Sequence, residues 1–219
     1  MKEISKYIQE ALHINEAIKH LPAGVSGLIV FDIDDTLLKS DPNDIKVWKK
    51  EPGKEEVALS TEEFAKDPDA ADKSKQNWFD YREFDDPEKV YQSIINGTPM
   101  IKNLKIMDSY LHAGYDFCFL TARGCEDVVK QALDDFIEVK DRETGVMKKL
   151  GERFKKTLSH AINDLEKRYP GKTDGERKSN VLRDLCSKYD NVVFVDDDDK
   201  NIKAAKALEL KNLKIIKAW

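Results

Sequence analysis

Two stretches decide the fold: Phe31-Asp32-Ile33-Asp34-Asp35-Thr36-Leu37 and Val192-Val193-Phe194-Val195-Asp196-Asp197-Asp198-Asp199. Each belongs to an apolar run, rich in β-branched residues, that ends abruptly in carboxylates. A buried strand that delivers acids at its C-terminal end is costly unless a cation meets them, because unpaired buried charges must be neutralised or coordinated. Two such strands side by side therefore predict a metal-centred active site.

Strands alternate with helices along most of the chain. The apolar run at 28–32 lacks polar alternation, which is typical of a strand covered on both faces. Other strands are predicted at 115–120, 191–196 and 213–216, and a short hairpin around 141–145. The first helix of the core is predicted to start with Thr98 as N-cap and Pro99 at the first helical position. Further helices are predicted at 125–136, 154–169, 174–188 and 202–208.

This order of elements predicts the α/β class, as a Rossmann-like, three-layer α/β/α fold around a parallel sheet. In such sheets, ligands bind outside the carboxyl ends of the strands. The acids at positions 32, 34, 196 and 197 all fall at that edge. The sequence therefore predicts that they lie together.

Two segments stand outside this pattern. Residues 41–97 are acidic and interrupted by prolines, so we predict an inserted cap or lid there, with a capped helix start at 59–64. Residues 1–24 are predicted to hold an amphipathic helix that packs on the core, with docking onto a protein partner as the alternative use of its apolar stripe. Residues 25–40 and 98–219 then form the catalytic core.

Composition excludes several classes of protein. The chain has 219 residues, of which 40% are hydrophobic and 36% charged, and no apolar run approaches the roughly 20 residues that span a bilayer. A net charge of -5 does not favour a general nucleic-acid coat protein. The N-terminus lacks the apolar core of a secretory signal, and the three cysteines lack disulfide or zinc spacing. We expect a cytoplasmic protein without membrane contact.

The first acidic stretch has the chemistry of a nucleophile with a proton-transfer partner. Side chains alternate along an extended segment, so Asp32 and Asp34 point to the same side. One carboxylate can then attack while its neighbour handles protons. A carboxylate that attacks phosphorus gives an aspartyl-phosphate, which water later hydrolyses.

Four motifs together resemble those of the haloacid dehalogenase (HAD) superfamily. They are Asp32-x-Asp34-x-Thr36 after a hydrophobic strand, Thr121 at the end of a second strand, a lysine before the last motif, and Asp196-Asp197 at the end of a third strand. They come in the order that the superfamily shows. The resemblance covers about 28–40 and 98–219, and it implies a HAD-like core of the phosphatase branch.

The resemblance implies roles for these residues. Asp32 would be the nucleophile and a Mg²⁺ ligand, and Asp34 the general acid and base whose backbone carbonyl also binds the metal. Asp196 would be the acidic metal ligand, with Asp197 beside it. Thr121 would hold a phosphoryl oxygen. The residues that would bind substrate are Thr36, Ala122 and Arg123.

Two assignments leave alternatives open. Lys178 is our choice for the phosphate-binding lysine, because it lies in the helix that leads to the last motif; Lys172 is the alternative. Arg123 has two interpretations. The N–H groups of its planar guanidinium can bind the oxygens of a substrate phosphate, and the residue equally suits a helix cap or an ion pair with a nearby acid. Asn201, five residues after Asp196, is expected to brace the last motif.

The function implied is a magnesium-dependent phosphomonoester hydrolase that acts on a small phosphometabolite or nucleotide. An aspartate at position 34 favours a phosphatase, because the dehalogenases of the superfamily lack it. A polynucleotide 3′ end is the alternative substrate: residues 148–183 are basic, but the acidic insertion argues against it. A non-catalytic binding or structural protein is the alternative from another class, although it would have no reason to retain a costly carboxylate cluster.

Overall fold

A computed structural model describes residues 18, 20–70, 72–140, 147–149, 158–161 and 168–218. The helix predicted for the N-terminal segment lies outside these residues, except for Ile18 and the chain from His20 onward. Within the described part of the chain, no helix is long and apolar enough to cross a bilayer.

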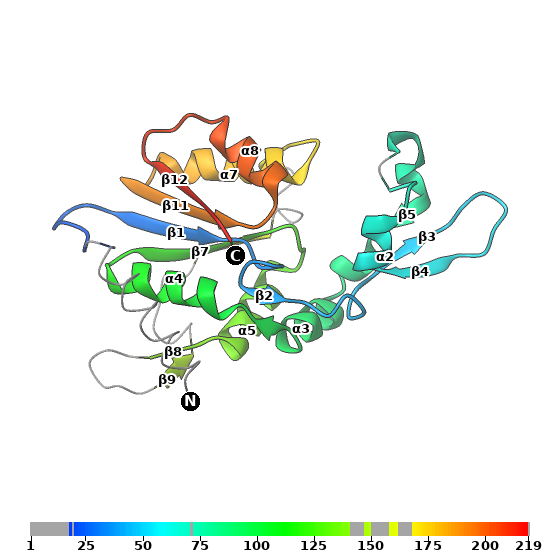
Figure 1. The fold of residues 1–219 in the computed structure, drawn as a ribbon, viewed down its shortest axis with the longest axis horizontal. Helices are drawn as coiled ribbons and strands as arrows, with labels where there is room; N and C mark the ends of the chain where they lie inside the picture. Colours follow the sequence, from blue (N-terminus) through cyan, green and yellow to red (C-terminus); the bar gives the residue numbers. More distant parts are fainter. Residues whose placement is uncertain are drawn as a thin grey trace.

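A five-stranded parallel sheet forms the centre of the molecule (Figure 1). Its order is β10-β7-β1-β11-β12, and each neighbouring pair is parallel. The predicted α/β class is therefore confirmed. The bounds of the strands are Gly27–Phe31 (β1), Asp116–Thr121 (β7), Leu158–Ala161 (β10), Asn191–Asp196 (β11) and Leu213–Lys217 (β12).

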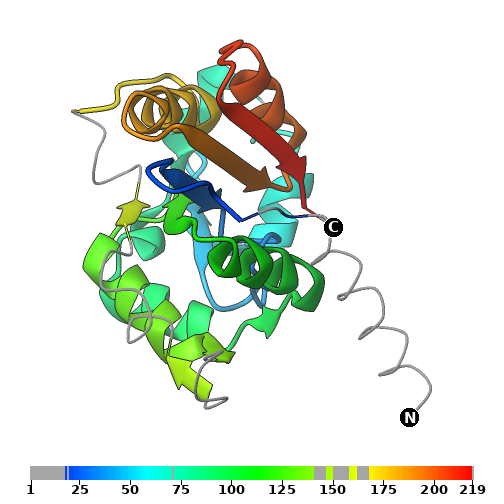
Figure 2. The same ribbon diagram turned by 90° about the vertical axis from the view of Figure 1, so that its left-hand side faces the viewer.

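Helices cover both faces of this sheet, as the unbroken apolar runs require. Ile29 and Phe31 of β1 pack on one side, with α4 (Ile101–His112) and α5 (Glu126–Phe136). Leu28 and Val30 pack on the other side, with α7 (Asp174–Cys186) and α8 (Asp199–Lys206). Figure 2 shows α7 and α8, in orange, above the sheet and α4 and α5, in green, below it. Because side chains alternate along a strand, each buried strand contributes to two cores.

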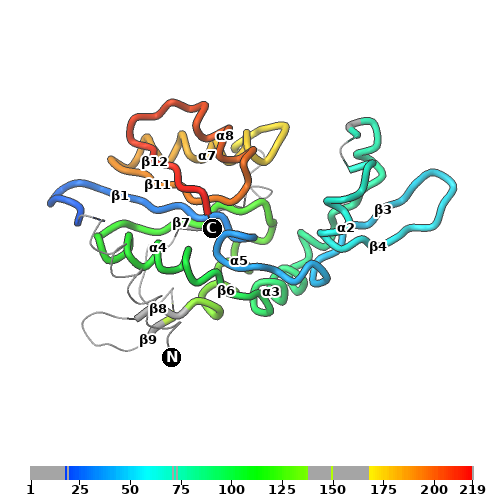
Figure 3. Tube along the Cα trace, in the orientation of Figure 1, coloured from blue at the N-terminus to red at the C-terminus, as the bar shows by residue number. Residues whose placement is uncertain are grey.

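The chain leaves the core after β1 and returns before α4 (Figure 3). Strands β2 (Leu38–Lys39) and β6 (Thr98–Pro99) pair antiparallel where it leaves and returns. Between them lies a second, antiparallel sheet of order β4-β3-β5. We call the segment between β2 and β6, residues 40–97, the excursion. Its elements are β3 (Lys46–Lys49), β4 (Val57–Ser60), α2 (Thr61–Lys66), the 3₁₀ helices η1 (Lys73–Trp78) and η2 (Arg82–Phe84), β5 (Phe79–Asp80) and α3 (Pro87–Ile95).

The excursion has two parts with different packing. Strands β3 to β5 and helix α2 project away from the carboxyl edge of the main sheet (Figure 1). Helix α3 instead packs into the main core, where Val90 and Ile94 join Val129 and Leu133 of α5. The predicted helix start at Ser60 is confirmed: its hydroxyl accepts from the Glu63 amide, and the Glu63 carboxylate accepts from the Ser60 amide.

The helix predicted after Thr98 is present as α4, but its predicted start is wrong. Thr98 and Pro99 form strand β6, and α4 starts only at Ile101, without a side-chain cap from Met100. The pairing of β2 with β6 extends the chain here, and the Met100 amide donates to the Leu37 carbonyl at 2.9 Å.

The helix predicted at 154–169 is also wrong where the structure describes it. Residues Leu158–Ala161 form β10, which pairs in parallel with β7. The spacing of Leu158 suits a helix, but pairing with the edge of a buried sheet outweighs that local preference. The predicted hairpin is present as β8 (Glu138–Lys140) paired with β9 (Met147–Lys149), and its turn lies outside the described residues.

Candidate active site

The carboxyl ends of the three central strands bring the predicted acids together. Asp196 is the last residue of β11 and Thr121 the last of β7, while Asp32 directly follows β1. The Asp32 amide continues the β1–β11 ladder by donating to the Val195 carbonyl at 3.0 Å. All three side chains are almost fully buried, with Asp196 completely inaccessible. The parallel register therefore places two carboxylates and a hydroxyl at one buried edge.

A third carboxylate completes a group of metal-ligand type. Oxygen atoms of Asp32, Asp196 and Asp197 all lie within 4.8 Å of one another. Asp197 is half-buried and accepts a hydrogen bond from the Thr36 hydroxyl at 3.1 Å. Carboxylate oxygens are the donors that hard divalent cations such as Mg²⁺ and Ca²⁺ prefer. The cluster therefore fits a hard metal ion.

Lys178 is the cation inside this cluster. Its ammonium lies 2.8 Å from Asp32 Oδ1 and 2.8 Å from Asp196 Oδ2, and the residue is only 3% exposed. Thr173 caps the N-terminus of α7 by accepting from the Glu176 amide, which starts the helix that carries Lys178 to this edge. Lys172, the alternative from the sequence, lies before that cap and is exposed. The structure thus brings Lys178, and not Lys172, to the acids.

The cluster is short of positive charge. Burial raises the pKa of Asp32 to about 8, with repulsion from Asp196 and Asp34 adding to the rise and attraction from Lys178 opposing it. Burial alone would lower the pKa of Lys178, but the two carboxylates outweigh that effect and raise it. One ammonium thus faces at least three carboxylates. A divalent cation would supply the missing charge.

Two donors besides Lys178 hold the Asp196 carboxylate in place. The Asn201 side-chain amide donates to both of its oxygens at 3.2 Å, and the Asp198 amide donates to Oδ1 at 2.8 Å. Asp198 also caps α8, because its side chain accepts from the Lys200 amide at 2.7 Å. This cap explains why α8 begins at Asp199, earlier than predicted. Asn201 therefore lies where a brace for the last motif is needed.

Arg123 pairs with Asp34 through a bidentate contact. Its Nε donates to Asp34 Oδ2 at 2.8 Å, and one terminal nitrogen donates to Asp34 Oδ1 at 2.6 Å. The same nitrogen donates to the Ser40 hydroxyl, and the other terminal nitrogen donates to the Ser93 hydroxyl and the Val90 carbonyl. A guanidinium has five N–H groups, and these contacts use all five. In this structure Arg123 holds an acid, which was one of its two interpretations.

The pair keeps Asp34 ionised. Burial raises the pKa of Asp34, but the charge and hydrogen bonds of Arg123, with help from Ser40, outweigh that effect and hold the pKa below its usual range. Ser40 donates to Asp34 Oδ1 at 2.7 Å. Arg123 is 3% exposed, whereas 43% of the Asp34 side chain remains accessible. Asp34 thus presents a fixed carboxylate towards solvent at the mouth of the site.

Sequence reasoning missed three residues that shape this site. Asn103 of α4 is fully buried and donates to the Thr36 carbonyl at 2.7 Å, which fixes the loop after β1. Ser40 and Ser93 bind Arg123 as described. None of the three stands in a motif, and Asn103 and Ser93 lie far from Asp32 in sequence. Only the fold reveals their proximity.

The remaining predicted residues lie at the same edge. The Thr121 hydroxyl accepts from the Arg123 amide at 3.2 Å, so it faces the turn that follows β7. Ala122, in that turn, is partly buried. A cavity of about 220 Å³ opens beside Asp34 and Arg123, between the main sheet edge and the excursion. Its other lining residues are Asp35, Ser40, Asp41, Ile45, Thr61, Phe84 and Ser93.

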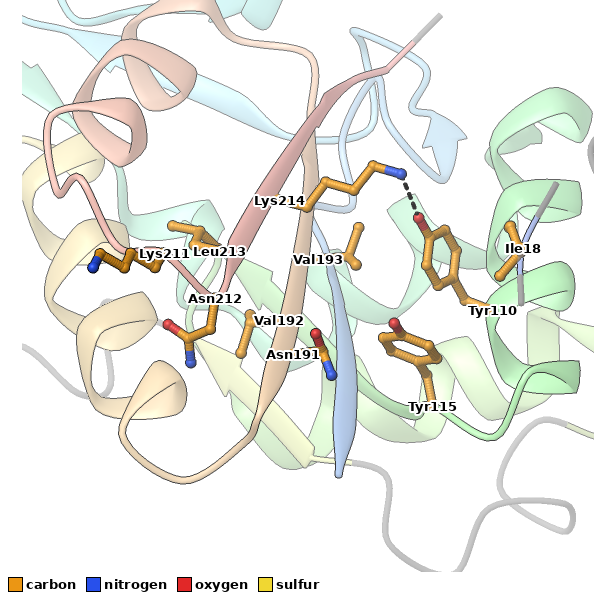
Figure 4. A pocket seen from close by; sticks show the side chains of 10 residues that line it. All are labelled: Ile18, Tyr110, Tyr115, Asn191, Val192, Val193, Lys211, Asn212, Leu213 and Lys214. Atoms are coloured by element: carbon orange, nitrogen blue, oxygen red, sulfur yellow. Dashed lines mark hydrogen bonds between the residues drawn. The ribbon is translucent and has the colours of Figure 1, made fainter. Parts of the chain in front are cut away.

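A larger cavity of about 360 Å³ lies elsewhere (Figure 4). It is formed by the first residues of β11, the start of β12 and the aromatic rings of Tyr110 and Tyr115. Lys214 crosses it and donates to the Tyr110 hydroxyl at 3.0 Å. Because it opens at the amino ends of these strands, and none of the described residues that line it is an acid, it is separate from the acid cluster.

None of the curated proteins compared with the chain matches it. A family model described as haloacid dehalogenase-like hydrolase matches residues 27–209. The matched range contains Asp32, Thr121, Lys178 and Asp196, which the structure gathers at one sheet edge. With this match over most of its length and the parallel α/β core to accompany it, the chain belongs to the haloacid dehalogenase-like hydrolase family.

Proposed function

We propose that this hydrolase is a magnesium-dependent phosphomonoesterase that works through an aspartyl-phosphate on Asp32. The observation that carries the proposal is the buried contact of Asp32 with Lys178, beside the carboxylates of Asp196 and Asp197. Clustered acids alone would repel a phosphate. Combined with a lysine and a metal, the same acids bind and activate it.

Asp32 and Asp34 divide the reaction between them. An Asp32 oxygen attacks phosphorus, the bond from phosphorus to the leaving oxygen breaks, and that oxygen takes a proton from Asp34, which must first accept this proton from solvent through its accessible face. Water then attacks the phosphoryl group, Asp34 takes its proton, and the bond to Asp32 breaks to release inorganic phosphate. The ion pair with Arg123 matches the second step, in which Asp34 acts as a base.

The neighbouring residues bind the phosphoryl group. Lys178 would offset charge on its oxygens in the transition state, and the Thr121 hydroxyl with the amides of the following turn would hold one oxygen. Magnesium, held by Asp32, Asp196 and the Asp34 carbonyl with Asp197 beside it, would neutralise the remaining charge. Asp34 favours phosphate ester hydrolysis over dehalogenation, because a leaving alcohol needs a proton and a halide does not.

The test compares Asp32→Asn with Asp199→Asn on p-nitrophenyl phosphate in the presence of Mg²⁺. Asparagine is isosteric but not nucleophilic, so Asp32→Asn should lower kcat by at least about a thousandfold. Asp199 belongs to the same acidic motif but is exposed and pairs with Lys217, so its variant should retain activity. Circular dichroism of both variants checks the fold. Full activity of a folded Asp32→Asn variant would contradict the proposal.

A further inference from the structure

The cavity beside Asp34 is where the leaving group must sit. This follows from the proposed function, because Asp34 protonates the leaving oxygen and therefore lies on that side of the phosphorus. The cavity measures about 220 Å³, below the roughly 300 Å³ at which pockets for drug-sized ligands begin. Phe84 forms part of its wall, and its ring is held edge-on by Tyr81. The space therefore suits a compact group.

The charges around this cavity are unbalanced. Arg123 is the one cation among the described residues that line it, and its charge is matched by Asp34. Asp35 and Asp41 then remain as carboxylates that no cation of the described lining balances, and Asp44 lies close enough to act on Arg123. Lys39 acts on Asp35 from outside the lining. The positive charge of Lys178 is engaged with Asp32 and Asp196, on the phosphoryl side.

The polar lining is otherwise made of hydrogen-bonding groups. Thr61, with its hydroxyl, and Asp41, with its carboxylate, are both among the lining residues. Asp41 accepts one hydrogen bond, from the Asn43 amide at 2.8 Å, which leaves its carboxylate with further acceptor capacity. Acceptors of this kind suit the hydroxyl or amino groups of a ligand. They repel an additional phosphate.

We propose that Asp35 and Asp41 restrict the substrate to phosphomonoesters of compact, uncharged alcohols, such as sugars and nucleosides. An ester whose alcohol carries a further phosphate is rejected, because that anion would enter a cavity with net negative charge. The same repulsion disfavours a polynucleotide 3′ end, whose alcohol side carries phosphodiesters. Specificity thus arises from charge on the leaving-group side, while the phosphoryl side accepts any phosphomonoester.

The experiment uses two matched pairs of substrates with Mg²⁺ at low ionic strength. The first is ribose 5-phosphate with ribose 1,5-bisphosphate, and the second is adenosine 3′-monophosphate with adenosine 3′,5′-bisphosphate. We expect kcat/KM for each monophosphate to exceed that for its bisphosphate by about tenfold or more. The ratio should fall as salt is added, because salt screens the repulsion.

Variants identify the residues responsible. The double variant Asp35→Asn/Asp41→Asn should reduce the ratio severalfold, because it removes both charges. Asparagine tolerates the positive φ of 51° at position 35 and keeps the acceptor oxygen that Asp41 offers Asn43. Glu55→Gln, an exposed acid between β3 and β4, is the matched control and should leave the ratio unchanged.

The outcomes separate this inference from the proposed function. Equal kcat/KM for the two members of each pair, or a ratio that the double variant does not change, would overturn the inference alone. Hydrolysis of p-nitrophenyl phosphate but of neither monophosphate would also overturn it, because both monophosphates belong to the proposed class. Failure to hydrolyse p-nitrophenyl phosphate itself would overturn the proposed function, and the inference with it.

Discussion

Arg123, like Lys178, binds an acid of the protein, but its contacts use all five of its N–H groups and leave none for a ligand. Its fork fixes both oxygens of Asp34, and lysine cannot reproduce this planar, bidentate geometry. We therefore regard Arg123 as a positioning residue for Asp34. A residue of this kind affects the rate of proton transfer more than the binding of phosphate.

Arg123→Lys should lower kcat by about tenfold to a hundredfold and leave KM nearly unchanged, because a misplaced proton-transfer group slows chemistry without weakening binding. Steady-state kinetics on an alkyl phosphate, whose alcohol needs the proton, measures both constants. Arg82→Lys changes an exposed arginine of η2 and should alter neither. A large increase in KM with constant kcat would instead identify Arg123 as a phosphate ligand.

Lys178 can be compared with Lys172, the alternative candidate for the phosphate-binding lysine. In the metal-free protein, Lys178→Met should lower the free energy of unfolding by about 3 kcal/mol near pH 8, since it leaves two buried carboxylates without their cation. Activity should be lost as well. Lys172→Met removes an exposed charge and should change stability by less than about 0.5 kcal/mol. Urea unfolding in the presence of a chelator measures both, and equal effects would show that the buried contact carries no stability.

At the scale of elements, the sequence predicts best those strands that are buried on both faces. Strands β1 and β11 are continuous apolar runs that end in acids, so their place in the sheet and the edge at which their acids meet follow from the residues alone. The acid cluster was predictable for the same reason. Strand β10 was not, because Leu158–Ala161 has no such run and becomes a strand only by pairing with β7.

The contacts of α3 with the site were equally unpredictable. Nothing in the sequence around Ser93 distinguishes it from other helical serines, yet it is 1% exposed and bonds with Arg123. Its hydroxyl also donates to the Val90 carbonyl at 2.9 Å. Such a contact arises from packing between α3 and α5, which no local pattern encodes. Helix α3 therefore links the excursion to the group that holds Asp34.

Ser93→Ala should lower the free energy of unfolding by about 1–2 kcal/mol, because it leaves a buried N–H group of Arg123 without its acceptor. The loss should be smaller in an Arg123→Lys background, since the two residues share one interaction. A double-mutant cycle followed by urea unfolding gives this coupling. Ser74→Ala, in the exposed first turn of η1, serves as the control. Strictly additive effects of the two changes would contradict the link.

At the scale of the whole molecule, the acid cluster joins parts of the chain that are far apart in sequence. Asp32 follows the first strand of the core, Lys178 comes from α7, and Asp196 ends β11. Without a metal, their mutual repulsion opposes folding as pH rises. The folded pKa of Asp32, about 8, exceeds its ordinary value of 3.8, so the folded state retains a proton that the unfolded state has lost. This group therefore costs increasing stability between about pH 4 and pH 8.

Bound Mg²⁺ should reverse that cost, because it requires ionised Asp32 and displaces the proton. We expect about 10 mM Mg²⁺ to raise Tm by about 2–4 °C at pH 8, and by less at pH 6, where removing the proton from Asp32 consumes part of the binding energy. Asp196→Asn should abolish the Mg²⁺-dependent shift at both pH values, whereas Asp199→Asn should retain it. Thermal unfolding with and without Mg²⁺ measures the effect independently of turnover. A shift of the same size at both pH values would contradict this prediction, because Asp32 would then already be ionised at pH 6 in the metal-free protein, with Lys178 alone balancing the cluster.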